Sequence, residues 1–122
     1  DIMHDYIWVL RKMQVYDTAN RLAQEIRESE EYKEYKKLKD EIHNDSEKKQ
    51  KVEDFEKLRY EVQLMAYTGE AKDEEKSKKL EEMYATLISD ENIKKYFDLE
   101  IKFNIMIADV NKIIAEAIKD VL

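Results

Sequence analysis

The sequence predicts an all-α protein: an elongated antiparallel helical bundle of four to five helices with a long C-terminal helix, assembled as a dimer. The 122 residues include 1 Gly and 0 Pro, whereas average usage of about 7% and 5% would give roughly 8 and 6. Sandwiches and barrels need such residues at their frequent turns, so we do not expect a sheet protein. Hydrophobic residues make up 43% of the chain and charged residues 42%, which is typical of a folded helical domain with a charged surface.

The first predicted helix spans residues 2–26, where no helix breaker interrupts the helical spacing of apolar residues. This stripe consists of Met3, Tyr6, Val9, Leu10, Met13, Tyr16, Ala19, Leu22, Ala23 and Ile26. The same pattern also fits two helices with a joint near Met13. We expect residues 1–12 to be either an N-terminal extension or the start of the first helix, and residues 13–122 to form a single helical domain.

Ser29 is predicted to begin the second helix, because a serine followed by Glu30 and Glu31 is typical of an N-cap with acidic residues in the first turn. The apolar face of this helix is expected to carry Tyr32, Tyr35, Leu38 and Ile42. The pattern stops at residues 43–46, where either Asp45 or Ser46 can cap the third helix.

The third helix is predicted to end at Gly69, the only glycine of the chain, which suits a left-handed residue after a helix. Its expected apolar stripe is Val52, Phe55, Leu58, Val62 and Met65. Residues 70–73 are the only predicted loop of any length, and Asp73 is a candidate cap for the fourth helix. The inward residues of that helix are expected to be Leu80, Met83, Tyr84, Leu87 and Ile88.

Ser89 or Asp90 is expected to cap the last helix, whose near-heptad apolar pattern continues for about 30 residues. The pattern comprises Ile93, Tyr96, Phe97, Ile101, Phe103, Ile107, Val110, Ile114, Ala117, Ile118 and Val121. Such a helix is about 45 Å long, whereas a compact chain of this length is roughly 35 Å across. We therefore expect a two-fold homodimer. The expected interface residues are Phe103, Ile107, Val110, Ile114, Ala117 and Ile118.

Three polar residues, Glu100, Asn104 and Asn111, lie at offsets of 4 and 7 and so share one stripe of the last helix. Buried in a helix–helix seam, such residues fix register and oligomeric state at a cost in stability. At the edge of the seam they stand half in water instead. Both interpretations fit the spacing.

The sequence offers little that points to catalysis or to a cofactor. With no cysteine there is no disulfide, thiolate metal site or cysteine nucleophile. Two acid-x-x-His steps, Asp1 to His4 and Asp40 to His43, resemble those of di-metal helical bundles. However, Asp1 is the first residue and His43 lies at a predicted helix end, so we expect both histidines to be solvated or capping. The interpretation is a non-enzymatic protein with no cofactor and no metal.

The charge balance of 22 basic to 29 acidic residues gives a net charge of −7, which disfavours direct binding to nucleic acid. The alternative is an RNA-binding module that uses the lysine-rich stretches 33–39 and 48–51, with Tyr32 and Tyr35 interleaved. No apolar run of about 18 residues is present, so we expect no membrane contact and a cytoplasmic location.

Several stretches occur in the order found in a known family. They are Tyr16-Asp17-x-Ala19-Asn20-x-Leu22-Ala23, then Glu28-Ser29-Glu30-Glu31-Tyr32-Lys33-Glu34-Tyr35, the cap led by Asp45, Glu100-x-x-Phe103-Asn104 and Val110-Asn111-Lys112-Ile113-Ile114. In combination they resemble the YlbF/YheA/YmcA family of small bacterial helical proteins, from about Val15 to the C-terminus. The resemblance implies long antiparallel helices, self-association and no known catalysis.

The same resemblance implies a regulatory role. Some members affect competence, sporulation and biofilm formation, and act in a complex that modulates a membrane-anchored endoribonuclease in messenger RNA processing. Those regulators carry cysteines that hold iron–sulfur clusters, whereas this chain has no cysteine. It is therefore more similar to the short, cysteine-free YheA-like branch, for which we expect a regulatory protein partner and no cofactor.

Overall fold

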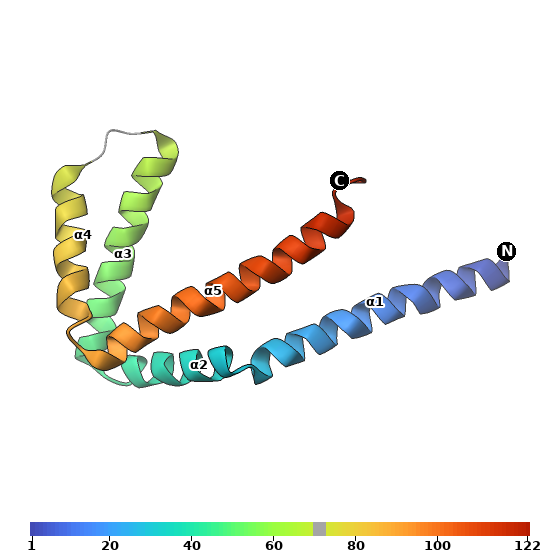
Figure 1. Cartoon of the computed structure of the whole chain (residues 1–122), viewed down its shortest axis with the longest axis horizontal. Coiled ribbons are helices and arrows are strands. Elements are labelled where there is room, and N and C mark those ends of the chain that lie inside the picture. The colour runs from blue at the N-terminus through green and yellow to red at the C-terminus, as the bar shows by residue number, and fades with distance from the viewer. Residues whose placement is uncertain (70–72) are drawn as a thin grey trace. The chain divides into compact units, whose positions relative to one another are not determined.

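The computed structural model describes residues 1–69 and 73–122, and all five of the elements it shows there are helices (Figure 1). They are α1 (Ile2–Glu28), α2 (Glu30–His43), α3 (Ser46–Thr68), α4 (Glu74–Leu87) and α5 (Glu91–Ile118). The predicted all-α class is confirmed. The chain divides into two compact units, Asp1–Glu34 and Tyr35–Leu122. Most of the predicted loop, residues 70–72, lies outside the described residues.

The first unit is built around α1, one uninterrupted helix of 27 residues with no joint near Met13. The carboxylate of Asp1 accepts a hydrogen bond from the Met3 amide at 3.0 Å and caps its start. At Ser29 the backbone turns to an extended conformation, and the Ser29 hydroxyl accepts from the Tyr32 amide at 3.2 Å. The predicted start of the second helix at Ser29 is confirmed. None of the residues of α1 is buried.

Aspartates start α3, α4 and α5, the three helices that lie wholly in the second unit. The Asp45 carboxylate accepts from the amides of the second and third residues that follow it, both at 3.2 Å, and begins α3. Asp73 accepts from the Lys76 amide at 3.0 Å and begins α4. Asp90 begins α5 by accepting from the Asn92 amide at 2.9 Å. Where the sequence left a choice between serine and aspartate, the aspartate is the cap.

Gly69 ends α3 in the left-handed conformation, with φ 76° and ψ 13°. A residue with a side chain is strained in this conformation, because its Cβ comes close to its own carbonyl oxygen, and glycine is therefore favoured at this position. Beyond it, α3 and α4 run side by side in opposite directions as a helical hairpin (Figure 1).

The core of the second unit lies where α2, the first half of α3, the end of α4 and the start of α5 meet. Its buried residues are Leu38, Ile42, Val52, Phe55, Leu87, Ile93, Tyr96, Phe97 and Leu99. Phe97 is central, with its ring centroid 5.3 Å from that of Phe55 and 5.7 Å from that of Tyr84. Offset and tilted rings at these distances stabilise the core beyond simple burial.

Two details of α5 differ from the predicted pattern. Ile101, expected to face inward, is 55% exposed, whereas Leu99, absent from the predicted stripe, is only 6% exposed. The reason is that α2, α3 and α4 all pack against the first turns of α5. At about 100° per residue, the buried arc turns from Phe97 through Ile93 and Tyr96 to Leu99, and Ile101 lies beyond its edge.

Candidate functional site

The α5 helix continues beyond its last buried residue, Leu99, as far as Ile118. Along this half, the six residues predicted to form an interface make a surface that we call the α5 seam: Phe103, Ile107, Val110, Ile114, Ala117 and Ile118. The first three are half-buried and the last three are exposed. An apolar heptad seam with its last turns exposed is a typical surface for pairing with another helix.

Glu100, the first member of the polar stripe, has its partner within the chain. Its carboxylate receives a hydrogen bond and an ion pair from Arg59 Nη1 of α3 at 3.0 Å, and its side chain is only 14% exposed. Asn104 and Asn111 are exposed on α5. The structure therefore separates the stripe into a carboxylate paired with α3 and two amides open to solvent in the single chain.

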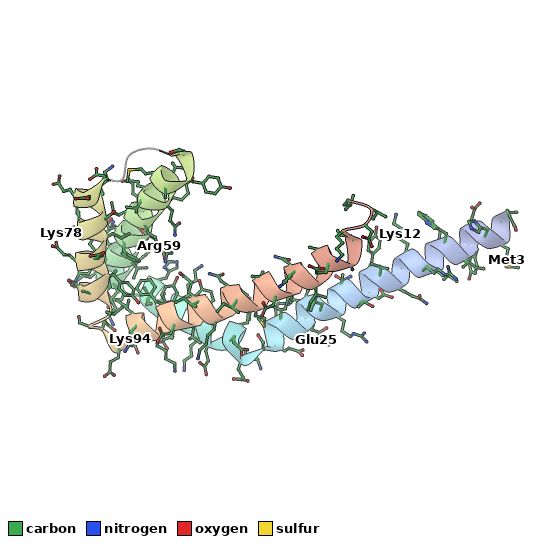
Figure 2. The ribbon with its side chains drawn as sticks, turned by 45° about the horizontal axis from the view of Figure 1, so that its top comes forward. Met3, Lys12, Glu25, Arg59, Lys78 and Lys94 are labelled. Atoms are coloured by element: carbon green, nitrogen blue, oxygen red, sulfur yellow. The ribbon has the colours of Figure 1, made fainter. Side chains whose placement is uncertain are left out.

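Sequence reasoning did not identify Arg59, which Figure 2 labels on α3. Its guanidinium carbon lies 5.5 Å from the ring centroid of Phe55, one turn earlier on the helix. This is the geometry of a cation–π contact. An arginine four residues after a core phenylalanine is the only local signal that could have suggested it.

A cleft of about 420 Å³ opens beside this ion pair, between α2, α3 and α5. Its lining includes Tyr35 and Tyr96, whose ring centroids are 5.3 Å apart. Burial raises the pKa of both phenols. Both tyrosines therefore remain neutral at physiological pH.

Glu56 also lines the cleft. Burial, and then the nearby charge of Glu100, raise the pKa of its carboxyl above the usual value. The carboxylates of Glu56 and Glu100 are thus both near a single positive group, the guanidinium of Arg59. The cleft is lined by tyrosine, lysine, histidine, glutamate, arginine, isoleucine and valine, with no serine, threonine or cysteine that a base could activate. This arrangement suits a polar junction that holds three helices together.

The predicted metal and RNA candidates lie as follows. Within residues 1–69 and 73–122, no group of three or more histidine and carboxylate side chains could hold a metal ion. His4 and His43 are both exposed. Tyr35 packs against Tyr96, and its ring centroid is 5.6 Å from that of Phe103. Its ring is therefore part of the packing of α2 against α5.

Two lysines of the basic stretches pair with acids. Lys48 Nζ lies 2.9 Å from the Asp90 carboxylate, which joins α3 to the cap of α5, and Lys51 pairs with Glu47 at 3.0 Å. The Lys48 ion pair lowers the pKa of Asp90. In the described part of the chain, no helix is long and apolar enough to cross a bilayer.

Comparison with known proteins gives a consistent family. A family model described as "Control of competence regulator ComK, YlbF/YmcA" matches residues 15–119. A UPF0342 protein of Halothermothrix orenii is 33% identical over 102 residues, covering 84% of this chain and 86% of the relative. A UPF0342 protein of Desulfitobacterium hafniense is 34% identical over 110 residues, covering 90% and 89%.

A solved structure has the same fold. It is a protein of unknown function (DUF964) from Bacillus stearothermophilus, with a TM-score of 0.74 and 19% sequence identity, covering 88% of this chain and 94% of that one. Since the family model spans most of the chain and relatives exceed 30% identity, the chain belongs to the YlbF/YmcA family.

Proposed function

We propose that this protein is a non-enzymatic cytoplasmic regulator that works as a homodimer through its helical surfaces. The observation that supports the proposal is the α5 seam, an apolar heptad pattern that continues past the core and is exposed in its last turns. Ile114 is 51% exposed and Ile118 39% exposed. Covering such side chains by a second copy is the simplest way to remove them from water.

The family supplies the direction of the regulatory role. Its model is described by control of the competence regulator ComK. We propose that the dimer acts as an adaptor that binds a regulatory protein partner and thereby influences cell fate, including through RNA processing. The candidate contact residues are the α5 seam together with Glu100, Asn104 and Asn111.

Light scattering on the purified chain tests the dimer. Ile114→Glu places a charge in the α5 seam and is expected to convert a dimer into a monomer at micromolar concentration. The matched control is Ile105→Glu: Ile105 is similarly exposed, at 56%, and lies nine residues away, about 180° around the helix. A wild-type mass equal to one chain, or equal loss of the dimer in both variants, contradicts the proposed seam.

Affinity purification from the native host tests the partner. A tagged wild-type chain is expected to retain a regulatory protein or a ribonuclease that the Ile114→Glu variant loses, as measured by mass spectrometry. If RNA rather than protein is retained, and remains bound at moderate salt, the proposed role is wrong and the lysine-rich helices are the binding surface.

A further inference from the structure

The cleft between α2, α3 and α5 has the features of a site for a small ligand. Figure 1 shows the ends of these three helices coming together. The cleft measures about 420 Å³, and all of its lining residues fall between Tyr35 and Glu100, so it is complete within the second unit. Small-molecule sites range from about 300 to 1,000 Å³. No residue of the α5 seam lines it, so the cleft is separate from the proposed dimer contact.

One end of the cleft carries more carboxylate than its own cations neutralise. Glu56 and Glu100 both lie there, and Arg59 Nη1 contacts Oε1 of Glu100 at 3.0 Å. Among the described residues, no ion pair involves Glu56, and no hydrogen bond reaches Oε2 of Glu100. The Glu56 carboxylate and one oxygen of Glu100 are therefore available to a cation that comes from outside the chain.

The Glu56 carboxylate is costly to the fold when no such cation is bound. It is half-buried, and burial followed by the charge of Glu100 raises the pKa of its carboxyl. A carboxyl with a raised pKa is less stable in its ionised form in the folded chain than in the unfolded one. Groups that line a cleft at a cost in stability are typical of binding sites.

The oxygens at this end suit an ammonium group. They come from three helices: Glu56 of α3, Glu100 of α5 and Tyr35 of α2, whose phenol interacts with both carboxylates. An ammonium has three donors that reach three separate oxygens, whereas a guanidinium suits the two oxygens of one carboxylate. The rings of Tyr35 and Tyr96, with centroids 5.3 Å apart, offer apolar surface to the carbon chain that bears the ammonium.

The remainder of the cleft is basic. Lys39 of α2 and Lys49 of α3 line it, and no ion pair among the described residues involves either lysine. Lys49 precedes Glu56 by seven residues, which is about 10 Å along α3. These two lysines attract an anionic group and repel the second charge of a polyamine. The cleft therefore has a carboxylate-rich end and an ammonium-rich end.

We propose that this cleft binds an ω-amino carboxylate, a molecule with an ammonium and a carboxylate at the two ends of an unbranched alkyl chain. The ammonium lies between Glu56 and Glu100, and the carboxylate lies beside Lys39 and Lys49. A chain of five methylenes separates the two groups by about 8 Å, given bonds of about 1.5 Å, which suits the spacing along α3. Lysine with a free carboxyl group has this chain, either as the amino acid or as the last residue of a peptide.

The first test compares three probes by nuclear magnetic resonance on the full wild-type chain. The probe 6-aminohexanoate has both charged ends, whereas pentylamine lacks the carboxylate and hexanoate lacks the ammonium. We expect 6-aminohexanoate to shift the amide signals of the cleft and to bind at least about tenfold more tightly than either. No shift there at about 10 mM probe, or equal binding of pentylamine, overturns the proposal.

The second test removes one charge from α3 inside or outside the cleft. Glu56→Gln keeps the shape of the side chain, and Asp54→Asn is the matched control, because Asp54 does not line the cleft. Glu56→Gln is expected to raise the dissociation constant of 6-aminohexanoate by more than about tenfold, and Asp54→Asn by less than about threefold. Thermal unfolding checks that Glu56→Gln is no less stable than the wild type, so that weaker binding is not a loss of fold. Equal effects of the two variants contradict the assigned ammonium position.

The third test examines the basic end through its selectivity. The double variant Lys39→Gln/Lys49→Gln is expected to weaken 6-aminohexanoate by more than about fivefold. The same variant is expected to bind pentylamine as tightly as the wild type or more tightly, because two positive charges are removed and pentylamine has no anion. A general disturbance of the cleft weakens both probes alike, and that result rejects the assigned carboxylate position.

Further probes separate the two sources of the ligand. Free lysine carries an α-ammonium that would lie near Lys39 and Lys49, and N-α-acetyl-lysine does not. Tighter binding of N-α-acetyl-lysine indicates the last residue of a peptide, whereas equal or tighter binding of free lysine indicates the amino acid. Spermidine that binds more tightly than 6-aminohexanoate shows a cleft that only collects positive charge, and overturns the proposal.

Failure here is distinguishable from failure of the proposed dimer. The Ile114→Glu variant is expected to bind 6-aminohexanoate as the wild type does, because the cleft is complete within one unit. Loss of binding in this variant, with its helicity retained, rejects a site within a single chain and leaves the dimer intact. A monomeric wild type that binds the probe rejects the dimer alone.

Discussion

Replacing Arg59 by methionine tests whether the polar junction beside the core stabilises the fold. The substitution keeps an unbranched apolar stem over Phe55 and removes the guanidinium that pairs with Glu100 at 3.0 Å. Arg59 and Glu100 are 33% and 14% exposed at their side chains. Glu100 then loses its partner in a place that water reaches poorly.

The magnitude follows from this partial burial. Exposed ion pairs contribute about 0.2–1 kcal/mol, whereas removing one partner of a buried pair costs about 3–5 kcal/mol. We expect about 1–2 kcal/mol for the lost pair and about 0.5–1 kcal/mol for the lost cation–π contact. For a chain of this size, the sum lowers the Tm by about 10 °C.

Thermal and urea unfolding followed by circular dichroism measure this effect, at one protein concentration because association adds to stability. The double variant Arg59→Met/Glu100→Gln is expected to be less destabilised than the sum of its two single variants, with a coupling energy of about 1–2 kcal/mol. Additive single effects, within about 0.5 kcal/mol, refute the assigned pair.

Three further substitutions probe local features. Asp90→Ala removes the cap of α5 and is expected to cost about 1 kcal/mol. Lys48 lowers the pKa of Asp90 in the fold, so the wild type is expected to be more stable than Asp90→Ala above about pH 4. This difference in stability disappears as the pH falls through the lowered pKa. A difference that grows in acid contradicts this. Gly69→Ala is expected to lower the free energy of unfolding by about 1 kcal/mol in urea, because alanine is strained at a φ of 76°. No further clash adds to this cost, since no atom lies within 4 Å of the new Cβ. An unchanged urea midpoint is the contrary result. Glu56→Gln is expected to raise the free energy of unfolding at pH 7, by less than about 1 kcal/mol since the carboxylate is partly solvated. The raised pKa of Glu56 means that its charged form opposes folding above that pKa, so the gain shrinks as the pH falls through it; an equal gain at pH 4 rejects that cause.

Much of the fold could be predicted from local patterns. The caps at Ser29, Asp73 and Asp90 follow from hydrogen bonds between residues two or three positions apart. The helix end at Gly69 follows from the left-handed conformation that glycine adopts readily. The α5 seam could be located in the same way, since heptad spacing is visible in the sequence. Its role as an interface stays a prediction, as does the single domain of residues 13–122.

The polar junction could not be predicted. Glu100 and Arg59 are 41 positions apart, and their meeting depends on how α3 crosses α5. The burial of Leu99 rather than Ile101 has the same origin. Helix spacing identifies the apolar stripe of α5, but it does not show how far around α5 the neighbouring helices extend. Both features follow from the packing angle between helices rather than from the period of either one.

The sequence by itself determined the all-α class, the order of the helices, most of their caps and the family. The reason is that helix formation, capping and apolar periodicity depend on residues within a turn or two of each other. Only the tertiary structure decided which part of each stripe is buried. It placed Phe97 at the centre of the core, gave Glu100 a partner in Arg59, and left the apolar residues of α1 uncovered in their unit. Burial depends on which helices meet, and the period of a single helix carries no information about its neighbour.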